Sequence, residues 1–502
     1  MRLMSSKPDS GTKAVGIFGP FTVLRGATRE LWLTFAIKFL IVAAYKVTTL
    51  TLVRWLSYDL GMSDQAALAM VGAWGLVMMG VTLLVGSLTD VLGLRRTFFL
   101  GAWICVLARA VMALSTTKWV ALTAGLFLLA IGEALGTPVL VAATRKYSNT
   151  RQRSVSFSMI YAIMNLGFLA SGYLFDWVRQ TLGEYGHWNL PILGWQLTTY
   201  RTLFLVSWAI ELLVLPVVWF LREGAEVTDE GVQIVPLHGP ATERTRTLSH
   251  AWQTVRESYF GTVDFFTKLV KQPGFYRLLS FLLLVSFLKL VFMQMDYVFP
   301  TWGVRELGEG APVGHLQAIN NYFIIFLVPV VGALTQRFSA YRMVIVGGTI
   351  TAASVFVMIL PPQWFESLAN GWVGHWIGHY YLGLHGTVHP YYVMVAFFVI
   401  AMSFGEAFYS PRVYEYAAAI APKGQEASYG ALSYIPFLLG KLVVATVSGT
   451  LLAKYCPAKG ERHSAILWLF LALMASIAPV GLTALQRFIR VQEEGRDESP
   501  PH

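Results

Sequence analysis

The sequence predicts an all-α membrane protein with twelve transmembrane helices, and three observations support this prediction. Apolar residues make up 55% of the chain and charged residues only 13%, whereas a soluble domain usually carries about 25% charged residues. Apolar stretches of roughly 18 residues or more, each long enough to cross a bilayer, follow one another along most of the chain. Motifs of the first half recur in the second half, which predicts two pseudo-symmetric bundles of six helices.

The apolar stretches give the bounds of the twelve helices, and each stretch holds few charged residues, as a bilayer requires. In chain order the predicted spans are residues 31–56, 67–89, 97–114, 119–144, 155–177, 202–221, 275–299, 316–335, 343–360, 391–416, 428–453 and 466–488. The first six spans form an N-terminal bundle, residues 31–221. The last six form a C-terminal bundle, residues 273–488.

Polar segments lie between and beside the bundles. Residues 1–30 and 489–502 are expected to be tails. Residues 222–272 are expected to be a linker, whose segment 250–271 is amphipathic and suited to the membrane surface. Residues 361–390 are an insertion that the first half lacks. The insertion contains His375, His379, His385 and His389. Because no cysteine joins these histidines, an interfacial helical hairpin is favoured over a metal site.

Positive charges predict the orientation of the chain in the membrane. Basic residues gather in the loops after the second, fourth and eighth spans and after the last one: Arg95, Arg96, Arg145, Lys146, Arg151, Arg153, Arg337, Arg342, Arg487 and Arg490. Cytoplasmic loops are rich in lysine and arginine. Both termini and the linker are therefore expected on the cytoplasmic side, most simply of the cell membrane, and the net charge of +10 agrees with this.

Composition also disfavours other classes of protein. Cys105 and Cys456 are the two cysteines of the chain, so neither a disulfide framework nor a cysteine metal site is expected. No Gly-rich nucleotide loop ending in Lys-Ser/Thr is present. No basic patch with interleaved aromatics stands on a soluble domain, so no nucleic-acid partner is expected. We expect a monomer that is not an enzyme and has no cofactor.

A repeated motif places one glutamate in the middle of each bundle. Gly132-Glu133-Ala134 is followed by Pro138 in the fourth span, and Gly405-Glu406-Ala407 is followed by Pro411 in the tenth. An ionisable residue at the centre of a membrane helix costs roughly 2.5–3.5 kcal/mol, so it needs a partner or a wet cavity. Glu133 and Glu406 are therefore predicted to face a shared cavity.

Other charged residues within the spans are candidate partners for these glutamates. Lys46, Lys289, Asp296 and Lys441 lie well inside their helices. Pairing with an opposite charge removes most of the cost of burying each of them. Fixed structural ion pairs are the alternative. Arg109 and Glu211 lie on peripheral helices or near helix ends, where snorkelling or local pairing is favoured.

The loop after the second span resembles the signature loop of the major facilitator superfamily. It reads Gly86-Ser-Leu-Thr-Asp90-Val-Leu-Gly93-Leu-Arg95-Arg96, and a degenerate copy occupies residues 332–342. The resemblance implies the twelve-helix fold of that superfamily, with Gly86, Asp90, Gly93, Arg95 and Arg96 as a gating motif. In that architecture helices 1, 4, 7 and 10 line the cavity. The resemblance therefore implies that Lys46 faces Glu133, and that Lys289 or Lys441 faces Glu406. Arg95 and Arg96 are expected to pair with Asp90, which lies at a helix end.

Two further motifs resemble those of proton-dependent oligopeptide transporters within that superfamily. Phe157, Tyr161, Asn165 and Gly167 are similar to the family's Phe-x-x-x-Tyr-x-x-x-Asn-x-Gly motif of helix 5. The run Gly405–Pro411 is similar to Gly-Glu-x-x-x-Ser-Pro of helix 10. The paired-glutamate motif of helix 1 is absent, with Tyr45 and Lys46 in that helix, and Thr137 stands where a lysine usually precedes the proline of helix 4.

Several polar and aromatic residues are candidates to contact a substrate. Tyr161, Asn165 and Tyr434 can hydrogen-bond a polar solute, although helix packing is equally compatible with each. Arg412 can bind an anionic group, or pair locally with Glu415 one turn away. Possible pocket aromatics, for which packing is the more common role, are Trp74, Tyr297, Tyr409 and Tyr414.

Together these features predict a secondary active transporter that works by alternating access, with protons, a small solute and the lipid bilayer as its partners. The resemblance implies proton-coupled symport of di- or tripeptides, with Lys46, Glu133, Tyr161, Asn165, Lys289, Asp296, Glu406, Arg412 and Lys441 as the substrate and proton-coupling residues. The alternatives are transport of another solute, such as an amino acid, nucleoside or drug-like compound, possible exchange instead of symport, and a receptor-like member without transport.

Overall fold

The computed structural model describes residues 24–190, 194–228, 231–234, 271–335, 338–420 and 435–489. Eleven helices within these residues are long and apolar enough to cross a membrane. The predicted span 428–453 begins outside the described residues, and its remainder is present as α18 (Ile435–Val443), η7 (Val444–Ser448) and α19 (Gly449–Tyr455). The predicted plan of two six-helix bundles is confirmed. The linker segment 250–271 and Tyr434 lie outside the described residues.

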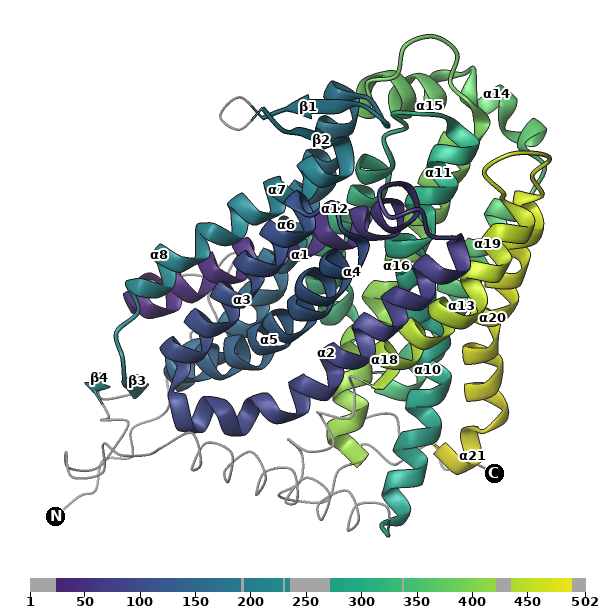
Figure 1. Ribbon diagram of the computed structural model, residues 1–502. Coiled ribbons are helices and arrows are strands. Elements are labelled where there is room, and N and C mark those ends of the chain that lie inside the picture. The colour runs from purple at the N-terminus through teal and green to yellow at the C-terminus, as the bar shows by residue number, and fades with distance from the viewer. Residues whose placement is uncertain are drawn as a thin grey trace, which may run out of the picture.

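The N-terminal bundle is built from long helices with short connections (Figure 1). They are α1 (Arg29–Tyr58), α2 (Asp64–Leu92), α3 (Leu94–Leu114), the continuous α4 (Lys118–Val120), η2 (Ala121–Phe127) and α5 (Leu128–Lys146), then α6 (Thr150–Leu182), α7 (Thr199–Leu212) and α8 (Val214–Trp219). Local chemistry sets several ends. Asn149 caps α6 by accepting from Gln152 N at 2.9 Å, and Gly93, with φ of 82°, ends α2.

The C-terminal bundle repeats this plan with an insertion. Its membrane helices are α10 (Pro273–Tyr297), α12 (Val313–Leu334), α13 (Ala340–Phe356), α16 (Pro390–Ile420), α18 with η7 and α19, and α20 (Ser464–Ala484). Shorter helices are α11 (Phe299–Leu307), η4 (Val357–Ile359) and α21 (Gln486–Ile489). The insertion holds η5 (Pro362–Phe365), α14 (Glu366–Ala369), α15 (Trp372–Gly374) and η6 (His375–Tyr381).

Two small hairpins depart from the expected all-helical pattern. Strands β1 (His187–Asn189) and β2 (Gln196–Thr198) pair antiparallel between α6 and α7. Strands β3 (Ala225–Thr228) and β4 (Gly231–Ile234) pair after α8, in the segment expected to be linker. Both lie outside the membrane helices, where backbone groups can pair between strands, so the fold class is unchanged.

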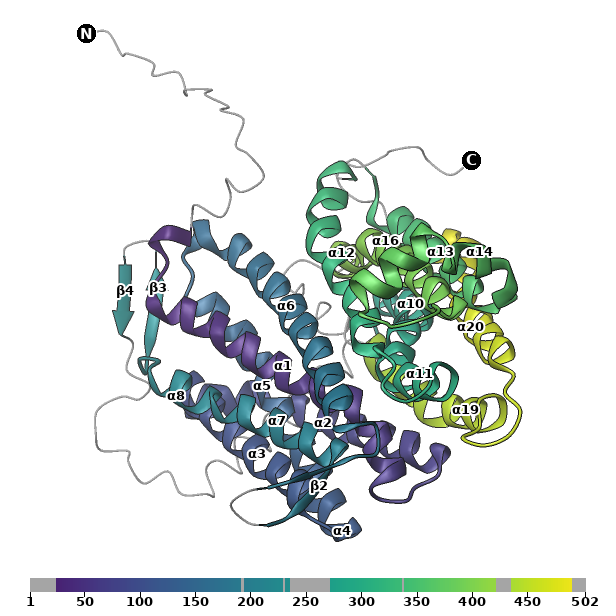
Figure 2. The same cartoon turned by 90° about the horizontal axis from the view of Figure 1, so that it is seen from above.

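The two bundles lie side by side (Figure 2). Helix α6 packs against α12, and α2 packs against α18, η7 and α19. We call the end that carries the 183–198 and 308–312 loops the closed end. From there α2 and α10 diverge toward the opposite end, near which α21 lies (Figure 1). We call that opposite end the terminal end.

Glycines allow the close approach of α6 and α12 at the closed end. A Cβ atom added at Gly172 would lie 2.6 Å from the carbonyl oxygen of Gly314, which is closer than two such atoms can approach. Close backbone contact of this kind is how membrane helices gain packing energy without large side chains. The absence of a side chain at Gly172 therefore decides how tightly this end closes.

Replacing Gly172 by valine is expected to separate the bundles at the closed end. Spin labels attached at the exposed positions Gln180 and Glu309 should report a longer distance by double electron–electron resonance. Valine at Gly332, on the same helix α12, is the control, because a Cβ there meets nothing within 4 Å. An unchanged distance in the Gly172 variant would show that this contact does not set closure.

Candidate functional site

A buried guanidinium organises the charges of the N-terminal bundle. Arg109 of α3 donates to the carboxylate of Glu133 on α5, to Glu211 Oε2 on α7 at 3.1 Å, and to Ser207 Oγ at 2.8 Å. Arg109 is fully buried, and Glu133 and Glu211 are 8% and 2% exposed. The prediction that Lys46 pairs with Glu133 is wrong, since Arg109 occupies that carboxylate. Snorkelling or local pairing was expected for Arg109 and Glu211; instead both are buried and pair with each other between α3 and α7.

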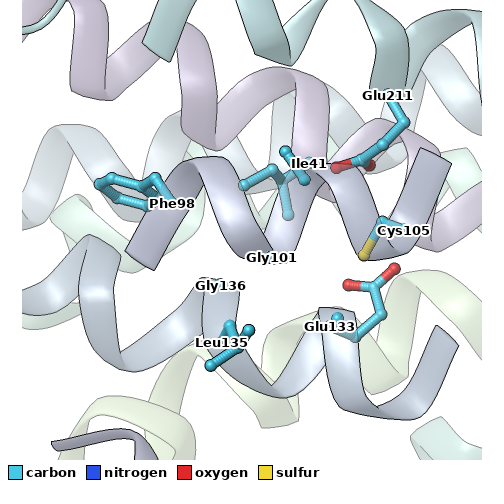
Figure 3. Close-up of a pocket in the computed structure, with 10 residues that line it drawn as sticks. Ile41, Phe98, Gly101, Cys105, Glu133, Leu135, Gly136 and Glu211 are labelled. Atoms are coloured by element: carbon cyan, nitrogen blue, oxygen red, sulfur yellow. The ribbon is translucent and has the colours of Figure 1, made fainter. Parts of the chain in front are cut away.

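The two carboxylates of this network line a small internal cavity (Figure 3). Glu133 and Glu211 reach toward Cys105 from opposite helices, and Ile41 and Leu135 close the cavity with apolar surface. Its volume is about 10 Å³, on the order of that needed for a single water molecule. The cavity thus has room for about one water molecule and is too small for a solute.

Glu406 has a different environment in the C-terminal bundle. It lies on α16, and its carboxylate accepts a hydrogen bond from Asn320 Nδ2 on α12 at 3.0 Å. Lys289 of α10 donates to Ser410 Oγ at 3.1 Å and lies over the Tyr409 ring at 5.1 Å. Lys289 also interacts electrostatically with Glu406, in agreement with one of the two partners predicted for this glutamate.

One ion pair connects the two bundles. Lys46 of α1 pairs with Asp296 of α10, and its ammonium also lies 5.2 Å from the centre of the Phe168 ring. The neighbouring Tyr45 and Tyr297 hydrogen-bond each other next to this pair. Since the partners belong to different bundles, any rocking of one bundle against the other changes the separation of these charges.

Lys441, the other of the two alternative partners expected for Glu406, faces α2 instead. Its ammonium lies 4.5 Å from the centre of the Trp74 ring, and Trp74 stacks on Tyr45 with ring centroids 5.9 Å apart. A Cβ at Gly75 would lie 2.7 Å from Lys441 Cδ, so the glycine makes room for the lysine stem. Lys441 therefore crosses from the C-terminal bundle to the N-terminal one.

Among the remaining predicted contact residues, Asn165 and Arg412 make local interactions and Tyr161 packs against the other bundle. Asn165 donates to the Tyr161 carbonyl oxygen at 2.9 Å, and Tyr161 packs against the cluster formed by α12 and α16. Arg412 pairs with Glu415 at 2.5 Å and donates to Thr335 Oγ1 at 2.8 Å. Arg412 therefore adopts the local pair that was its alternative role, and it ties α16 to the end of α12.

The gating motif is anchored to the end of the sixth membrane helix. Arg95 donates to the Trp219 carbonyl oxygen at 2.9 Å and covers the Trp219 ring. Arg96 pairs with Glu223 at 2.7 Å, so both arginines contact the chain at or just after the end of α8. Gly93 has the positive φ that joins α2 to α3. The surroundings of Gly86 and the side chain of Asp90, the partner expected for Arg95 and Arg96, lie outside what the structure describes, so that pairing stays a prediction.

A buried network that we did not predict joins the bundles at the closed end. Asp176 of α6 accepts from Gly314 N at 3.1 Å and from His315 N at 2.7 Å, which caps the first turn of α12. Arg179, one turn further along α6, donates to Asp176 at 3.1 Å and to the Ala311 carbonyl oxygen at 3.0 Å. Asp176 and Arg179 are at most 1% exposed.

Glu184 completes this network in the loop outside the membrane helices. It accepts from Arg179 Nε at 2.9 Å and from the Tyr200 hydroxyl. Burial opposes the ionised form of Glu184, but the Arg179 guanidinium outweighs it, so the pKa of Glu184 lies below its usual value. Ionised Glu184 therefore contributes to the free energy of unfolding. The contribution is fully present above the ordinary glutamate pKa of about 4.3, and it is lost as the pH falls through the lower pKa of the folded state.

Simple sequence signals could have revealed both networks. Arg109 and Glu211 have no opposite charge three or four residues away on their own helices, so each needs a partner on another helix. Asp176 and Arg179 stand three residues apart, the spacing of a helical ion pair. The predicted fifth span ended at residue 177, whereas α6 continues to Leu182, so Arg179 was placed beyond the helix.

The histidines of the insertion do not converge with other ligands. His375 and His379 lie with ring centroids 5.0 Å apart, and His379 Nδ1 is 2.7 Å from the Leu384 carbonyl oxygen. Within the described residues, no group of three or more His, Cys, Asp or Glu side chains comes together as a metal site would require.

Comparison with known proteins identifies the family. Residues 34–386 match the family model of the Major Facilitator Superfamily. The chain is 31% identical over 173 residues to the methyl viologen resistance protein SmvA of Salmonella typhimurium, a match covering 32% of this chain and 34% of that protein. The chain thus spans about a third of the length of the curated relatives it matches.

Solved transporter structures share the fold. One from work on substrate recognition in proton dependent oligopeptide transporters superposes with a TM-score of 0.64 and 18% identity, covering 92% of this chain and 98% of that one. A POT family transporter in complex with 5-aminolevulinic acid gives a TM-score of 0.64 at 16% identity, covering 95% of this chain and 98% of that one. At these identities the likeness to solved structures establishes the fold alone. The family model, by contrast, matches well over half of the sequence, and the chain therefore belongs to the major facilitator superfamily.

Proposed function

We propose that this protein is a proton-coupled symporter of a small polar solute, such as a di- or tripeptide, that works by alternating access. The observation that carries the proposal is the environment of Glu406. Its carboxylate accepts from the Asn320 amide, and Lys289, the cation that acts on it electrostatically, donates its hydrogen bond to Ser410. A carboxamide can donate to a carboxylate or accept from a carboxylic acid. Glu406 can therefore be held in either protonation state, as a proton carrier requires.

The other charged pairs are suited to couple that proton to movement. Lys46 and Asp296 connect the bundles, and Arg109 holds Glu133 and Glu211 inside the N-terminal bundle. Breaking a buried pair leaves an uncompensated charge, so such a pair opens only when a ligand or a proton replaces the partner. This gives each pair two discrete arrangements, one for each state of the transporter.

The contacts between the bundles correspond to one state of the transport cycle. The bundles meet at the closed end through α6 and α12. Helix α2 begins at Asp64, which pairs with Arg305 beside the 308–312 loop of the closed end. Arg95 and Arg96 follow the other end of α2 and so belong to the terminal end, and basic loops predict the cytoplasmic side. On that orientation this structure is the inward-facing state, and the Asp176–Arg179–Glu184 network is the contact that seals the outer side.

Uptake of labelled dialanine into proteoliposomes tests the proposed function. An inward proton gradient should drive accumulation in the wild type. Glu406→Gln should abolish that accumulation and retain exchange of dialanine across the membrane. Glutamine can keep the hydrogen bond to Asn320, but it cannot take up and release a proton. Glu309→Gln, at an exposed position, is the matched control. Gradient-driven uptake by the Glu406 variant, or no uptake by a folded wild type, would contradict proton-coupled peptide symport.

A second candidate is export of a drug-like cation by exchange with protons. The partial similarity to a methyl viologen resistance protein favours it, as does the aromatic pair of Tyr45 and Trp74 beside Asp296, since cations bind aromatic faces. Methyl viologen should then release protons from loaded proteoliposomes. The absence of release, with dialanine uptake intact, would exclude this candidate.

A further inference from the structure

Two buried hydrogen-bond donors lie together at the bundle interface without a partner. The Lys441 ammonium and the Trp74 indole N–H make no hydrogen bond to any residue in the described part of the chain. Lys441 is 5% exposed and Trp74 is fully buried, and the ammonium lies 4.5 Å from the centre of the indole ring. Buried polar groups are nearly always satisfied. Because both groups are donors only, the missing partner is a hydrogen-bond acceptor.

The charges around Lys441 form a balanced set that we call the central cluster. Its cations are Lys46, Arg109 and Lys441, and its carboxylates are Glu133, Glu211 and Asp296. Ion pairs connect Lys46 to Asp296 and Arg109 to both glutamates. Lys441 interacts electrostatically with Asp296 and Glu133 but is within ion-pair distance of neither. The cluster is neutral when every member is ionised, with its positive charge unpaired at Lys441.

We propose that the Lys441 ammonium and the Trp74 indole N–H form a subsite for a carboxylate group of the transported solute, and that this carboxylate enters together with one proton taken up by Glu133 or Glu211. The role of this subsite in transport rests on the proposed symport. To that proposal it adds an anionic group that the solute must carry. Binding of the carboxylate alone would give the buried cluster one net negative charge. Protonation of one of the two glutamates that share Arg109 restores neutrality.

Because two glutamates share Arg109, one of them can take up and release a proton while the other keeps its ion pair. Arg109 contacts both carboxylates, so when one glutamate is neutral the other still has a partner. The small cavity between them adjoins Cys105 and is lined otherwise by apolar groups. The groups that face Glu133 and Lys441 from neighbouring helices are Arg109, Cys105, Tyr45, Tyr297, Asp296 and Trp74.

Matched ligands with and without the charge test the subsite on the full-length purified protein. The probes are dialanine and 3-phenylpropionate, each compared with its amide, and binding is measured as a rise in melting temperature with ligand concentration. The carboxylates should stabilise the wild type and the amides should not. Lys441→Gln should weaken carboxylate binding by about 10- to 100-fold, the effect of losing a charged hydrogen bond. Lys454→Gln, at an exposed position after η7, is the control and should bind as the wild type does.

Proton uptake separates a binding role of Lys441 from a merely structural one. In weakly buffered solution with a pH indicator, saturation by the bound carboxylate should remove roughly one proton per wild-type protein. Glu211→Gln should bind the carboxylate with no proton uptake, because the neutral glutamine already supplies the compensation. Equal binding of carboxylate and amide, no binding of either carboxylate by the wild type, or unchanged binding by Lys441→Gln would overturn the proposal.

The outcomes also separate this subsite from the proposed function. If dialanine is not transported but 3-phenylpropionate binds through Lys441, peptide symport fails and the carboxylate subsite stands. If dialanine amide is accumulated as fast as dialanine, symport stands and the subsite fails.

Discussion

Replacement of Arg109 by leucine is expected to destabilise the N-terminal bundle by roughly 3–5 kcal/mol, because it leaves buried carboxylates without their partner. Glu133 and Glu211 both depend on Arg109, and Ser207 accepts from it as well. The melting temperature of the detergent-solubilised protein should fall sharply, and uptake of dialanine should be lost. The effect should be large because a single substitution leaves two buried charges unpaired at once.

Neutralising the two glutamates in the same variant should restore much of the lost stability. The combination Arg109→Leu, Glu133→Gln, Glu211→Gln removes the charges that the leucine leaves unpaired, so it should melt closer to the wild type while remaining inactive. Arg96→Leu is the matched control, since its pair with Glu223 involves a 60% exposed side chain and such pairs contribute about 0–1 kcal/mol. Equal melting temperatures for the single and triple variants would contradict the assigned partners.

Substitution of Lys46 by methionine is expected to reduce gradient-driven uptake by about 100-fold, equivalent to about 3 kcal/mol. The reason is that Asp296 loses the cation that connects the bundles. Asp296 keeps 24% side-chain exposure, so the loss of stability should be smaller than that of Arg109→Leu. The measurement is dialanine uptake under a pH gradient, together with melting temperature.

Exchange of the two charges tests whether the pair itself matters. Lys46→Asp with Asp296→Lys keeps an ion pair across the interface, so it should recover uptake relative to either single change. If the exchanged pair is as inactive as Lys46→Met while the protein remains folded, then the identity of each group matters, for example as a proton acceptor, and not the pairing. If Lys46→Met transports normally, this pair has no role in the cycle.

The long apolar spans and the repeated motifs were sufficient to predict the membrane helices and their grouping into two bundles. The period of the chain's hydrophobicity is a local property, and a bilayer requires every spanning segment to satisfy its own backbone, so helices can be predicted without knowing their neighbours. The small hairpin β1–β2 and the extension of α6 to Leu182 were missed because they lie beyond the apolar spans. There the bilayer no longer requires each segment to satisfy its own backbone.

The pairing of charges could be predicted only in part. Glu133 and Glu406 stood out because a lone carboxylate in an apolar span is costly. The partner of Glu133 was expected to be Lys46 from the helix arrangement that the superfamily resemblance implies, whereas Arg109 holds it. Of the two alternatives for Glu406, Lys289 acts on it, and Lys441 lies over Trp74 on the other bundle. Successive side chains of an α-helix point about 100° apart, so a residue's position in a span does not say which neighbouring helix it faces.

The sequence by itself thus determined the fold class, the number of spans and which residues carry charge into the membrane, because each follows from local composition and from the cost of burying polar groups. The tertiary structure alone decided which charge meets which, that Lys46 and Asp296 join the bundles, and that Asp176 caps α12 at the closed end. Those contacts join residues far apart in the chain, and their geometry depends on the packing and rotation of whole helices, which no local pattern encodes.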